Sequence, residues 1–328
     1  MPQSLPLSRR RLLAGISAAG LAGLAPLPRA QAKAPMLNVQ APAYYRFKVG
    51  AFEATVISDG PLAMGEPKPE LFAGVTKDAI THALAENFLP ADNLSLEQNA
   101  LVVNTGDRLV LIDTGTGSAK MFGDRSGRLL TNLRAAGFDP ADIDSIVLSH
   151  AHPDHCWGLV GANGARNFPN AQIHIAQADL DFWTDEAKRS APFIGQLIDP
   201  TRAALLPYRD RVVFVKDGQE VVPGIQALSA PGHTVGHTIF MISSQGQTLC
   251  NVADLAHHHV LVLENPKVEF GFDTDPKQGA ATRIRMFDML AAQRIALIAY
   301  HFPWPGIGHV VSHGGGYRFI AAPLQMVL

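Results

Sequence analysis

Hydrophobic side chains recur with two spacings along the chain, and the spacing predicts where strands and helices lie. Residues 44–49 and 52–57 alternate apolar and polar positions on either side of a glycine turn, which is typical of a β-hairpin. Residues 99–103 and 109–112 form a second pair of the same kind. These four segments predict that the fold begins with paired strands.

Farther along, segments with helical spacing alternate with short apolar strands. Helical spacing is found at 77–87 and 129–136, and a buried strand at 146–148 runs directly into His150. The later segments repeat this order, with expected helices at 178–186 and 280–293 and expected strands at 172–176, 212–215, 225–228, 238–242, 248–252, 295–299 and 317–320. The pattern predicts one layered α/β domain of mixed sheets flanked by helices.

Composition is that of a globular protein with a large core. Hydrophobic residues make up 47% of the 328 residues and charged residues 17%, far from the composition of disordered chains. Two cysteines exclude a disulfide scaffold. A formal net charge of −2 disfavours nucleic acid as a partner.

The first 32 residues have the features of an export signal. Arg9-Arg10 resembles a twin-arginine signal, and the apolar run from Leu12 to Leu27 is shorter than the ~20 residues of a membrane span. Ala30-Gln31-Ala32 fits a cleavage site, which leaves a single mature domain of residues 33–328 with a net charge of about −6. We therefore expect a bacterial periplasmic or secreted protein without stable membrane insertion. An uncleaved anchor is the alternative.

The two cysteines, Cys156 and Cys250, could pair in an oxidising compartment. Each lies in an apolar stretch beside a candidate ligand segment, which favours two buried free thiols.

The segment His150-Ala151-His152-Pro153-Asp154-His155 holds three imidazoles and a carboxylate directly after a buried strand. Residues i and i+2 of an extended segment point the same way, so His150 and His152 can bind one ion. Pro153 favours the start of a helix, which would direct Asp154 and His155 to a neighbouring position. The cluster predicts a site for two divalent ions.

Further donors follow other predicted strands. His233 lies in the segment Pro231–His237, Asp254 follows the strand at 248–252, and His301 follows the strand at 295–299. Ligands carried at strand ends are held rigidly, as a site of fixed geometry requires.

These residues resemble the pattern of the metallo-β-lactamase superfamily, which is H-x-H-x-D-H followed by a distant His, a distant Asp and a final His. Leu111-Ile112-Asp113-Thr114-Gly115 is similar to that superfamily's early L-x-D-T-G segment. The resemblance covers most of the mature chain and implies an αββα sandwich, in which two mixed β-sheets are flanked by helices.

The resemblance also implies a role for each donor. His150, His152 and His233 would hold the first metal, Asp154, His155 and His301 the second, and Asp254 would bridge them. Asp113 would support the ligands from behind. His237 is expected to orient the His233 loop rather than to bind metal.

Two divalent ions, zinc or similar, suit hydrolysis. Coordination lowers the pKa of water from 15.7 to about 7, so a metal-bridging hydroxide would exist at neutral pH. Asp154 and Asp254 are therefore predicted to be catalytic as well as ligating. The chain has no G-x-S-x-G elbow, which argues against a serine esterase.

Within the superfamily the chain resembles methyl parathion hydrolase and related lactonases. The segments that carry this resemblance are Tyr44-Tyr45-Arg46, Ser58-Asp59-Gly60, Asp181-Phe182-Trp183, the run Phe302–His309 and Gly316-Tyr317-Arg318-Phe319. It implies an aromatic substrate pocket, for which the candidates are Phe122, Trp157, Trp183, Phe193, His257, Phe270 and Phe272. Ordinary core packing explains Phe122, Trp183 and Phe193 equally well.

Two positions depart from the superfamily pattern. Cys156-Trp157-Gly158 stands where a small residue and two glycines are usual, and Ala253 stands where a glycine usually precedes the bridging Asp. Neither change removes a donor, so both bear on pocket shape rather than on metal binding.

The expected substrate is a small, neutral, hydrophobic ester, either a lactone or an aryl ester. An organophosphate triester and a β-lactam are the alternatives within hydrolysis, and a non-catalytic metal- or ligand-binding protein is the alternative of another class. The sequence leaves open the natural substrate, the metal, the proton donor to the leaving group and the oligomeric state, including a homodimer.

Overall fold

The computed structural model describes Ala34, Met36, residues 43–326 and Leu328. The predicted export signal and its cleavage site lie outside the described residues. The chain divides at Ala41 into two units, and the fold is that of the second, Pro42–Leu328. Within the described part, no helix combines the length and the apolar character needed to cross a membrane.

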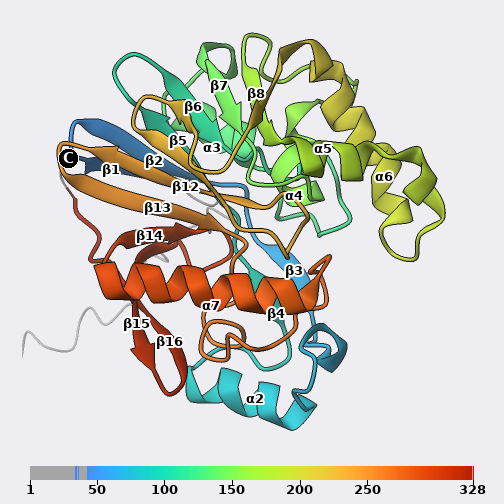
Figure 1. Cartoon of the computed structure of the whole chain (residues 1–328), viewed down its shortest axis with the longest axis vertical. Helices are drawn as coiled ribbons and strands as arrows, with labels where there is room; N and C mark the ends of the chain where they lie inside the picture. Colours follow the sequence, from blue (N-terminus) through green and yellow to red (C-terminus); the bar gives the residue numbers. More distant parts are fainter. Residues whose placement is uncertain (1–33, 35, 37–42, 327) are drawn as a thin grey trace, which may run out of the picture. The chain divides into compact units, whose positions relative to one another are not determined.

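Two seven-stranded sheets form the body of this unit (Figure 1). The first sheet contains, in spatial order, β1 (Tyr44–Val49), β2 (Phe52–Ser58), β5 (Asn99–Asn104), β6 (Leu109–Ile112), β7 (Ser145–Val147), β8 (Gln172–Ala176) and β9 (Val212–Val215). The second contains β10 (Glu220–Val222), β11 (Ile225–Ser229), β12 (Thr238–Ser244), β13 (Gln247–Ala253), β14 (Ala296–Ala299), β15 (Ile307–His313) and β16 (Gly316–Ala321). A small separate sheet pairs β3 (Leu62–Gly65) with β4 (Leu94–Leu96).

Both large sheets are mixed. In the first sheet β1, β2, β5 and β6 pair antiparallel, and β6 to β9 pair parallel. In the second sheet β13 and β14 pair parallel, and their neighbours pair antiparallel. The carboxyl ends of β11, β13 and β14 consequently lie at one edge of the second sheet.

Helices are found between and after the strands. The α-helices are α2 (Lys77–Glu86), α3 (Leu129–Ala135), α4 (Pro153–Cys156), α5 (Gln177–Thr184), α6 (Gly195–Leu205) and α7 (Pro276–Gln293). Short 3-10 turns are η1 (Pro69–Leu71), η2 (Pro140–Asp142), η3 (Trp157–Leu159), η4 (Glu186–Ser190) and η5 (Leu206–Arg211). Local chemistry sets the ends of α7, because the Asp275 side chain accepts the Gln278 N–H, Pro276 starts the helix, and Arg294 ends it at a φ of 55°.

Three hydrophobic clusters separate four layers. One cluster joins α3, α5 and α6 to the first sheet, a second lies between the sheets, and a third joins the second sheet to α7. The alternation of side chains along one strand shows this directly, since Val102 of β5 packs toward the helices and Val103 toward the other sheet. The layers confirm the predicted αββα sandwich, and Figure 1 shows α7 next to β14 and β15.

The hydrophobic pattern did not anticipate α6 or the strands β3, β4, β10 and β15. Helix α6 contains Pro200 and starts at Gly195, both of which disfavour a helix, yet it buries Leu197, Ile198 and Leu205. Strand β15 runs out of the aromatic and glycine-rich segment that follows His301. Both cysteines are buried and unpaired.

Candidate metal centre

The seven predicted donors come from strand ends and meet at one place. His150 lies three residues after β7, and His152 directly precedes α4, which begins with Pro153 and carries Asp154 and His155. His233, Asp254 and His301 follow β11, β13 and β14, whose carboxyl ends share an edge. Six of the seven side chains are buried and His152 is half-buried.

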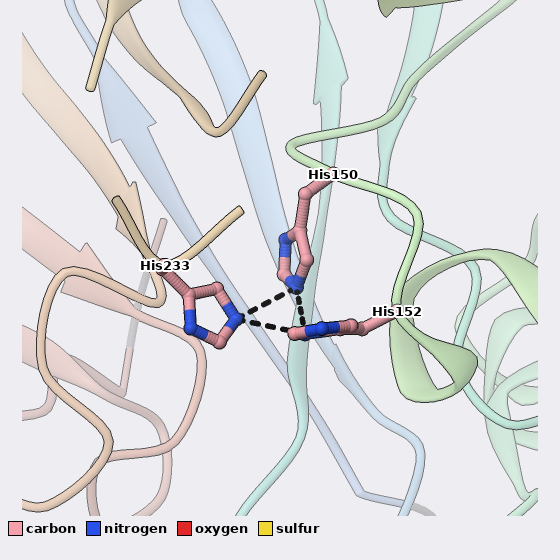
Figure 2. A group of neighbouring side chains, drawn as sticks. All are labelled: His150, His152 and His233. Carbon is pink, nitrogen blue, oxygen red and sulfur yellow. Dashed lines mark hydrogen bonds between the residues drawn. The ribbon is translucent and has the colours of Figure 1, made fainter. Parts of the chain in front are cut away.

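Three imidazoles form the first group. Figure 2 shows the rings of His150, His152 and His233 directed at a common point. His150 Nε2 lies 3.0 Å from His152 Nδ1 and 3.1 Å from His233 Nε2, and the remaining pair is 2.8 Å apart. Ligand nitrogens around a tetrahedral zinc ion, at 2.0–2.1 Å from it, lie about 3.3 Å apart. The observed spacing is therefore close to the one that a shared ion requires.

Hydrogen bonding alone does not satisfy this triangle. A pair of ring nitrogens forms a hydrogen bond only when one carries the proton and the other the lone pair. Among three mutually adjacent nitrogens, at least two must be alike, so one contact is unfavourable. A cation that accepts all three lone pairs removes the conflict, and the donor set fits a divalent metal on this ground.

Asp154, His155 and His301 form the second group. Asp154 Oδ2 lies 3.4 Å from Nε2 of both His155 and His301. The same two imidazoles approach Asp254, at 3.3 Å to Oδ1 and 3.1 Å to Oδ2. His155 Nε2 and Asp254 Oδ1 are buried without a hydrogen-bond partner, and a bound cation would satisfy both atoms.

Asp254 lies between the two groups. Its Oδ2 is 3.3 Å from His233 Nε2 and 3.8 Å from His150 Nε2, while Oδ1 faces His155. All seven donors belong to clusters whose ligand atoms lie within 4.8 Å of one another. The structure therefore brings together every residue that the sequence motif nominated.

The electrostatics of the site favour cations. Burial holds the pKa of His150 and His152 well below 6.5, so both rings are neutral and offer lone pairs. Burial also acts on His233, but the carboxylates of Asp254 and Asp273 outweigh it and raise its pKa to about 9. Carboxylates that attract a proton this strongly attract a metal ion placed between the same groups.

Outer contacts fix the orientation of the rings. Asp113 Oδ2 accepts from His155 Nδ1 at 2.9 Å and from the Ser149 hydroxyl at 2.7 Å, as expected for a supporting residue. The backbone carbonyl of Glu97 lies 2.7 Å from His301 Nδ1. Such partners hold a metal-binding imidazole in one tautomer and one orientation.

His237 connects two ligand segments. Its Nδ1 lies 3.0 Å from the Ala230 carbonyl, and its Nε2 accepts the backbone N–H of Asp254 at 3.2 Å. Burial keeps the pKa of His237 low, at about 3, so the ring is neutral with the proton on Nδ1. The ring ties the start of the His233 loop to Asp254, and it belongs to no cluster of metal-ligating atoms in the described part of the chain.

Sequence reasoning missed Asp273, which holds His233. Asp273 Oδ1 lies 2.9 Å from His233 Nδ1, and Oδ2 lies 3.3 Å from a guanidinium nitrogen of Arg283. Arg283 is itself buried and donates to the carbonyls of Leu255, Pro266 and Val268. The available signal was an acidic residue at the end of the apolar run Phe270-Gly271-Phe272, which is too short a pattern to be specific.

A cavity of about 130 Å³ opens over the two groups. Its walls are Leu62, Met64, Leu96, Met121, Phe122, Pro153, Phe193, Leu197, His257 and Phe272, and its floor is His152, Asp154, His233, Asp254 and His301. Four of the predicted pocket residues, Phe122, Phe193, His257 and Phe272, are therefore on the wall. Phe193 stacks on Phe272 with ring centroids 5.9 Å apart.

The other three pocket predictions need correction. Trp157 donates from Nε1 to the Thr201 hydroxyl at 2.9 Å and packs in the helix layer. Trp183 is buried against the edge of the His152 ring, and Phe270 is buried under His257 at a centroid distance of 4.1 Å. None of the three lines the cavity: Trp183 lies behind the ligand His152, Phe270 lies behind His257, and Trp157 is bonded to Thr201, which is not part of the lining.

His257 is placed closer to the donors than predicted. Its Nε2 lies 3.2 Å from Asp254 Oδ2, and its Nδ1 is buried without a hydrogen-bond partner. The next two histidines, His258 and His259, line a separate cavity of about 280 Å³ on the other side of His301.

The two departures from the superfamily pattern have distinct structural outcomes. Gly158 remains obligatory, because a Cβ there would lie 1.8 Å from the Thr114 carbonyl oxygen. Ala253 adopts a φ of 44°, a region that favours glycine. It lies where β13 carries one extra residue relative to β14, and its N–H is bonded by the Asn251 side chain at 3.1 Å.

The sandwich of two mixed sheets, with imidazoles and carboxylates gathered at the strand ends, defines a metallo-hydrolase. The chain belongs to the Metallo-beta-lactamase superfamily, whose model matches residues 96–314.

Similar proteins include lactonases. A curated N-acyl homoserine lactonase from Bacillus sp is 26% identical over 215 residues, which cover 60% of this chain and 78% of the relative. The solved structure of AidC, a dizinc quorum-quenching lactonase in complex with a product, is 31% identical with a TM-score of 0.78 and covers 86% of this chain and 98% of its own. The structure of AbOPH, a hydrolase in the beta lactamase superfamily, is 29% identical with a TM-score of 0.81, over 88% of this chain and 100% of its own.

Proposed function

We propose that this protein is a dinuclear metal-dependent lactonase that opens N-acyl homoserine lactones or closely similar hydrophobic lactones. The observation that carries the proposal is the set of seven converging donors at the floor of a small apolar cavity. The similarity of this chain, over most of its length, to a dizinc lactonase also supports the proposal.

In this proposal His150, His152 and His233 hold one divalent ion, and Asp154, His155 and His301 hold the other. Asp254 would contribute to both, since its carboxylate approaches His233 of the first group and both His155 and His301 of the second. The donor set of five imidazoles and two carboxylates suits zinc. When bound, the ions polarise the substrate carbonyl and lower the pKa of water to about 7, which supplies a nucleophile at neutral pH.

Other residues of the chain orient the ligands and shape the substrate site. The outer contacts of Asp113, Asp273 and the Glu97 carbonyl keep the ligating rings in place while the substrate binds. The apolar walls exclude water from the reacting ester. His257 lies beside Asp254 on the cavity wall and forms, with His233 and Asp254, a further group of possible ligand atoms.

The form of the cavity supports a lactone with an apolar tail. Its enclosed part is small, at about 130 Å³, and its rim carries the exposed side chains of Met121 and Phe193. A compact lactone ring would occupy the floor, and an acyl chain would extend along the rim. Apolar contact of this kind contributes about 25 cal/mol per Å² of buried surface.

A substrate panel on the metal-analysed protein tests the proposal. We expect about two zinc or similar ions per chain and a kcat/KM for N-hexanoyl or N-decanoyl homoserine lactone at least ~100-fold above that for methyl paraoxon or nitrocefin, a difference of about 2.7 kcal/mol. Dihydrocoumarin distinguishes a general aryl-lactone esterase from an acyl-homoserine lactonase. A ~100-fold preference for the phosphotriester, efficient β-lactam turnover, or inactivity of the metal-replete protein on the whole panel would each overturn it.

We further propose that residues 1–32 direct export of the folded protein to the periplasm. The paired arginines, the short apolar run and the Ala30-Gln31-Ala32 segment support this. Fractionation of bacteria that produce the full chain should recover periplasmic protein with Lys33 at its N-terminus. Protein that stays in the cytoplasm with an intact N-terminus would contradict the proposal.

A further inference from the structure

Helix α5 presents a buried carboxylate to the back of the metal centre. Asp179, in the first turn of this helix, has no solvent-exposed surface. Its Oδ2 accepts the backbone N–H of Ala151 at 2.7 Å, and its Oδ1 accepts the backbone N–H of Gly236 at 2.9 Å. A carboxylate that accepts backbone N–H groups forms short, charge-assisted hydrogen bonds.

The two bonded residues lie in the two loops that supply the first group of imidazoles. Ala151 stands between His150 and His152, and Gly236 stands in the turn that carries His233. One carboxylate therefore joins two loops that come from different sheets. The backbones also meet directly, through Thr238 N–H and the Ser149 carbonyl at 2.9 Å, so Asp179 adds a second connection on the side of the ligands.

The close approach at this connection is built into the sequence. A Cβ on Gly236 would lie 2.8 Å from Asp179 Cβ, so the loop can reach the helix only with glycine there. One turn later on the same helix, the Trp183 ring packs edge-on against His152 with centroids 4.9 Å apart. The helix thus contacts the backbone beside one ligand and the ring of another.

The distances in the first group show what this connection accomplishes. The three ligating nitrogens lie 2.8–3.1 Å apart, and a metal site tolerates displacements of about 0.5 Å. His150 and His152 belong to one loop and His233 to the other, so a small relative shift of the loops would open the group. Asp179 opposes that shift.

We propose that Asp179 is a positioning residue that sets the affinity of the first metal position by joining the His150–His152 loop to the His233 loop. The inference depends on the proposed function, because it assumes that this group binds a metal ion. Asp179 touches neither the ion nor the substrate.

The variant Asp179→Asn tests the proposal. It keeps the shape of the side chain and one acceptor oxygen, but directs an amide NH₂ at one of the two backbone N–H groups. Asp181→Asn is the matched control, since Asp181 is exposed on the same helix. Zinc or cobalt binding to the metal-free mature protein is measured by competition with a chromophoric chelator, and unfolding of the metal-free protein is measured in parallel.

We expect binding at one of the two positions, the one formed by His150, His152 and His233, to weaken 10–100-fold in Asp179→Asn, as is usual when a supporting partner is lost. Asp181→Asn should bind like the wild type. At saturating metal, KM should stay within about twofold of the wild type. Asp113→Asn, which loosens His155 instead, should change the cobalt absorption of the other position.

Different results overturn different statements. A wild-type protein that binds no metal refutes the proposed function itself. Wild-type affinity in Asp179→Asn, or a loss of stability without a change in metal affinity, refutes the positioning role alone. If Asp179→Asn does not fold, Asp179→Glu is measured in the same way, because it keeps both acceptor oxygens; failure of both to fold with metal present also refutes it.

Discussion

The floor and the walls of the cavity are built on different principles. On the floor, directional hydrogen bonds hold the rings of His233 and His301, and every ligating side chain except the half-buried His152 is buried. On the walls, apolar side chains from separate strands, helices and loops meet without such bonds, and Met121 and Phe193 remain 54% and 59% exposed. Directional contacts fix geometry, whereas apolar contacts mainly fix volume. Changes on the floor should therefore affect chemistry, and changes on the walls should affect selectivity.

The largest effect is expected from Asp254→Ala. The carboxylate is the one donor that faces both groups, so its loss removes a ligand from each. We expect kcat/KM for a lactone to fall at least about 1,000-fold, which equals about 4 kcal/mol of transition-state stabilisation. Elemental analysis should show fewer than two ions per chain. Near-normal turnover, with Asp181→Ala as control, would show that the floor does not act as a unit.

Asp273→Asn should have the next largest effect and should change both metal binding and stability. It removes the charged partner of His233 and of the buried Arg283. Metal affinity should fall 10–100-fold, and the free energy of unfolding should fall by roughly 3 kcal/mol, because a buried charge is left unpaired.

Chelator competition and urea unfolding measure these two quantities for Asp273→Asn. Asp107→Asn, in an exposed turn, supplies the control. If affinity and stability both match the control, the contact between Asp273 and His233 has no role in supporting the floor.

A wall residue should behave differently. In Phe193→Ala the stacking partner of Phe272 is lost from the rim, but little buried surface is lost because the ring is largely exposed. We expect KM for a long-chain lactone to rise about fivefold, or about 1 kcal/mol, with kcat within twofold. Phe214→Ala, on an exposed strand position away from the cavity, is the matched control. A fall in kcat as large as the rise in KM would show that wall and floor residues do not differ in this way.

The smallest kinetic effect is expected from Trp157→Phe. The indole N–H donates to Thr201, and neither residue lines the cavity, so loss of this bond should lower the free energy of unfolding by about 1 kcal/mol and leave kcat/KM unchanged. A double-mutant cycle with Thr201→Val isolates the hydrogen bond. A clear change in substrate preference would indicate that Trp157 contacts the substrate and belongs to the cavity wall.

The floor could be predicted from sequence because its donors lie in local patterns. His150 to His155 occupy six consecutive positions after a buried strand, and His233, Asp254 and His301 each follow a strand end. Asp273 and Asp179 could not be found in this way, because their bonded partners lie 28 to 57 residues away in the chain. Their function depends on how the layers pack.

The walls were predicted only in part for the same reason. Phe270 and Phe272 are two residues apart, yet one is buried under His257 and the other lines the cavity. Similarly, α6 forms around Pro200 because its apolar face is buried, which overrides a poor local propensity. Aromatic composition indicates a pocket but does not assign its members.

The extra residue in β13 has a consequence for how related chains should be compared. Side chains alternate between the two faces of a strand, so the number of residues from Asn251 to Asp254 decides on which side of the sheet the carboxylate emerges. A chain that lost one residue here would keep every letter of the ligand motif and still direct its aspartate away from the imidazoles. Counting positions across this irregularity is therefore a stricter criterion for a working homologue than matching the histidines themselves.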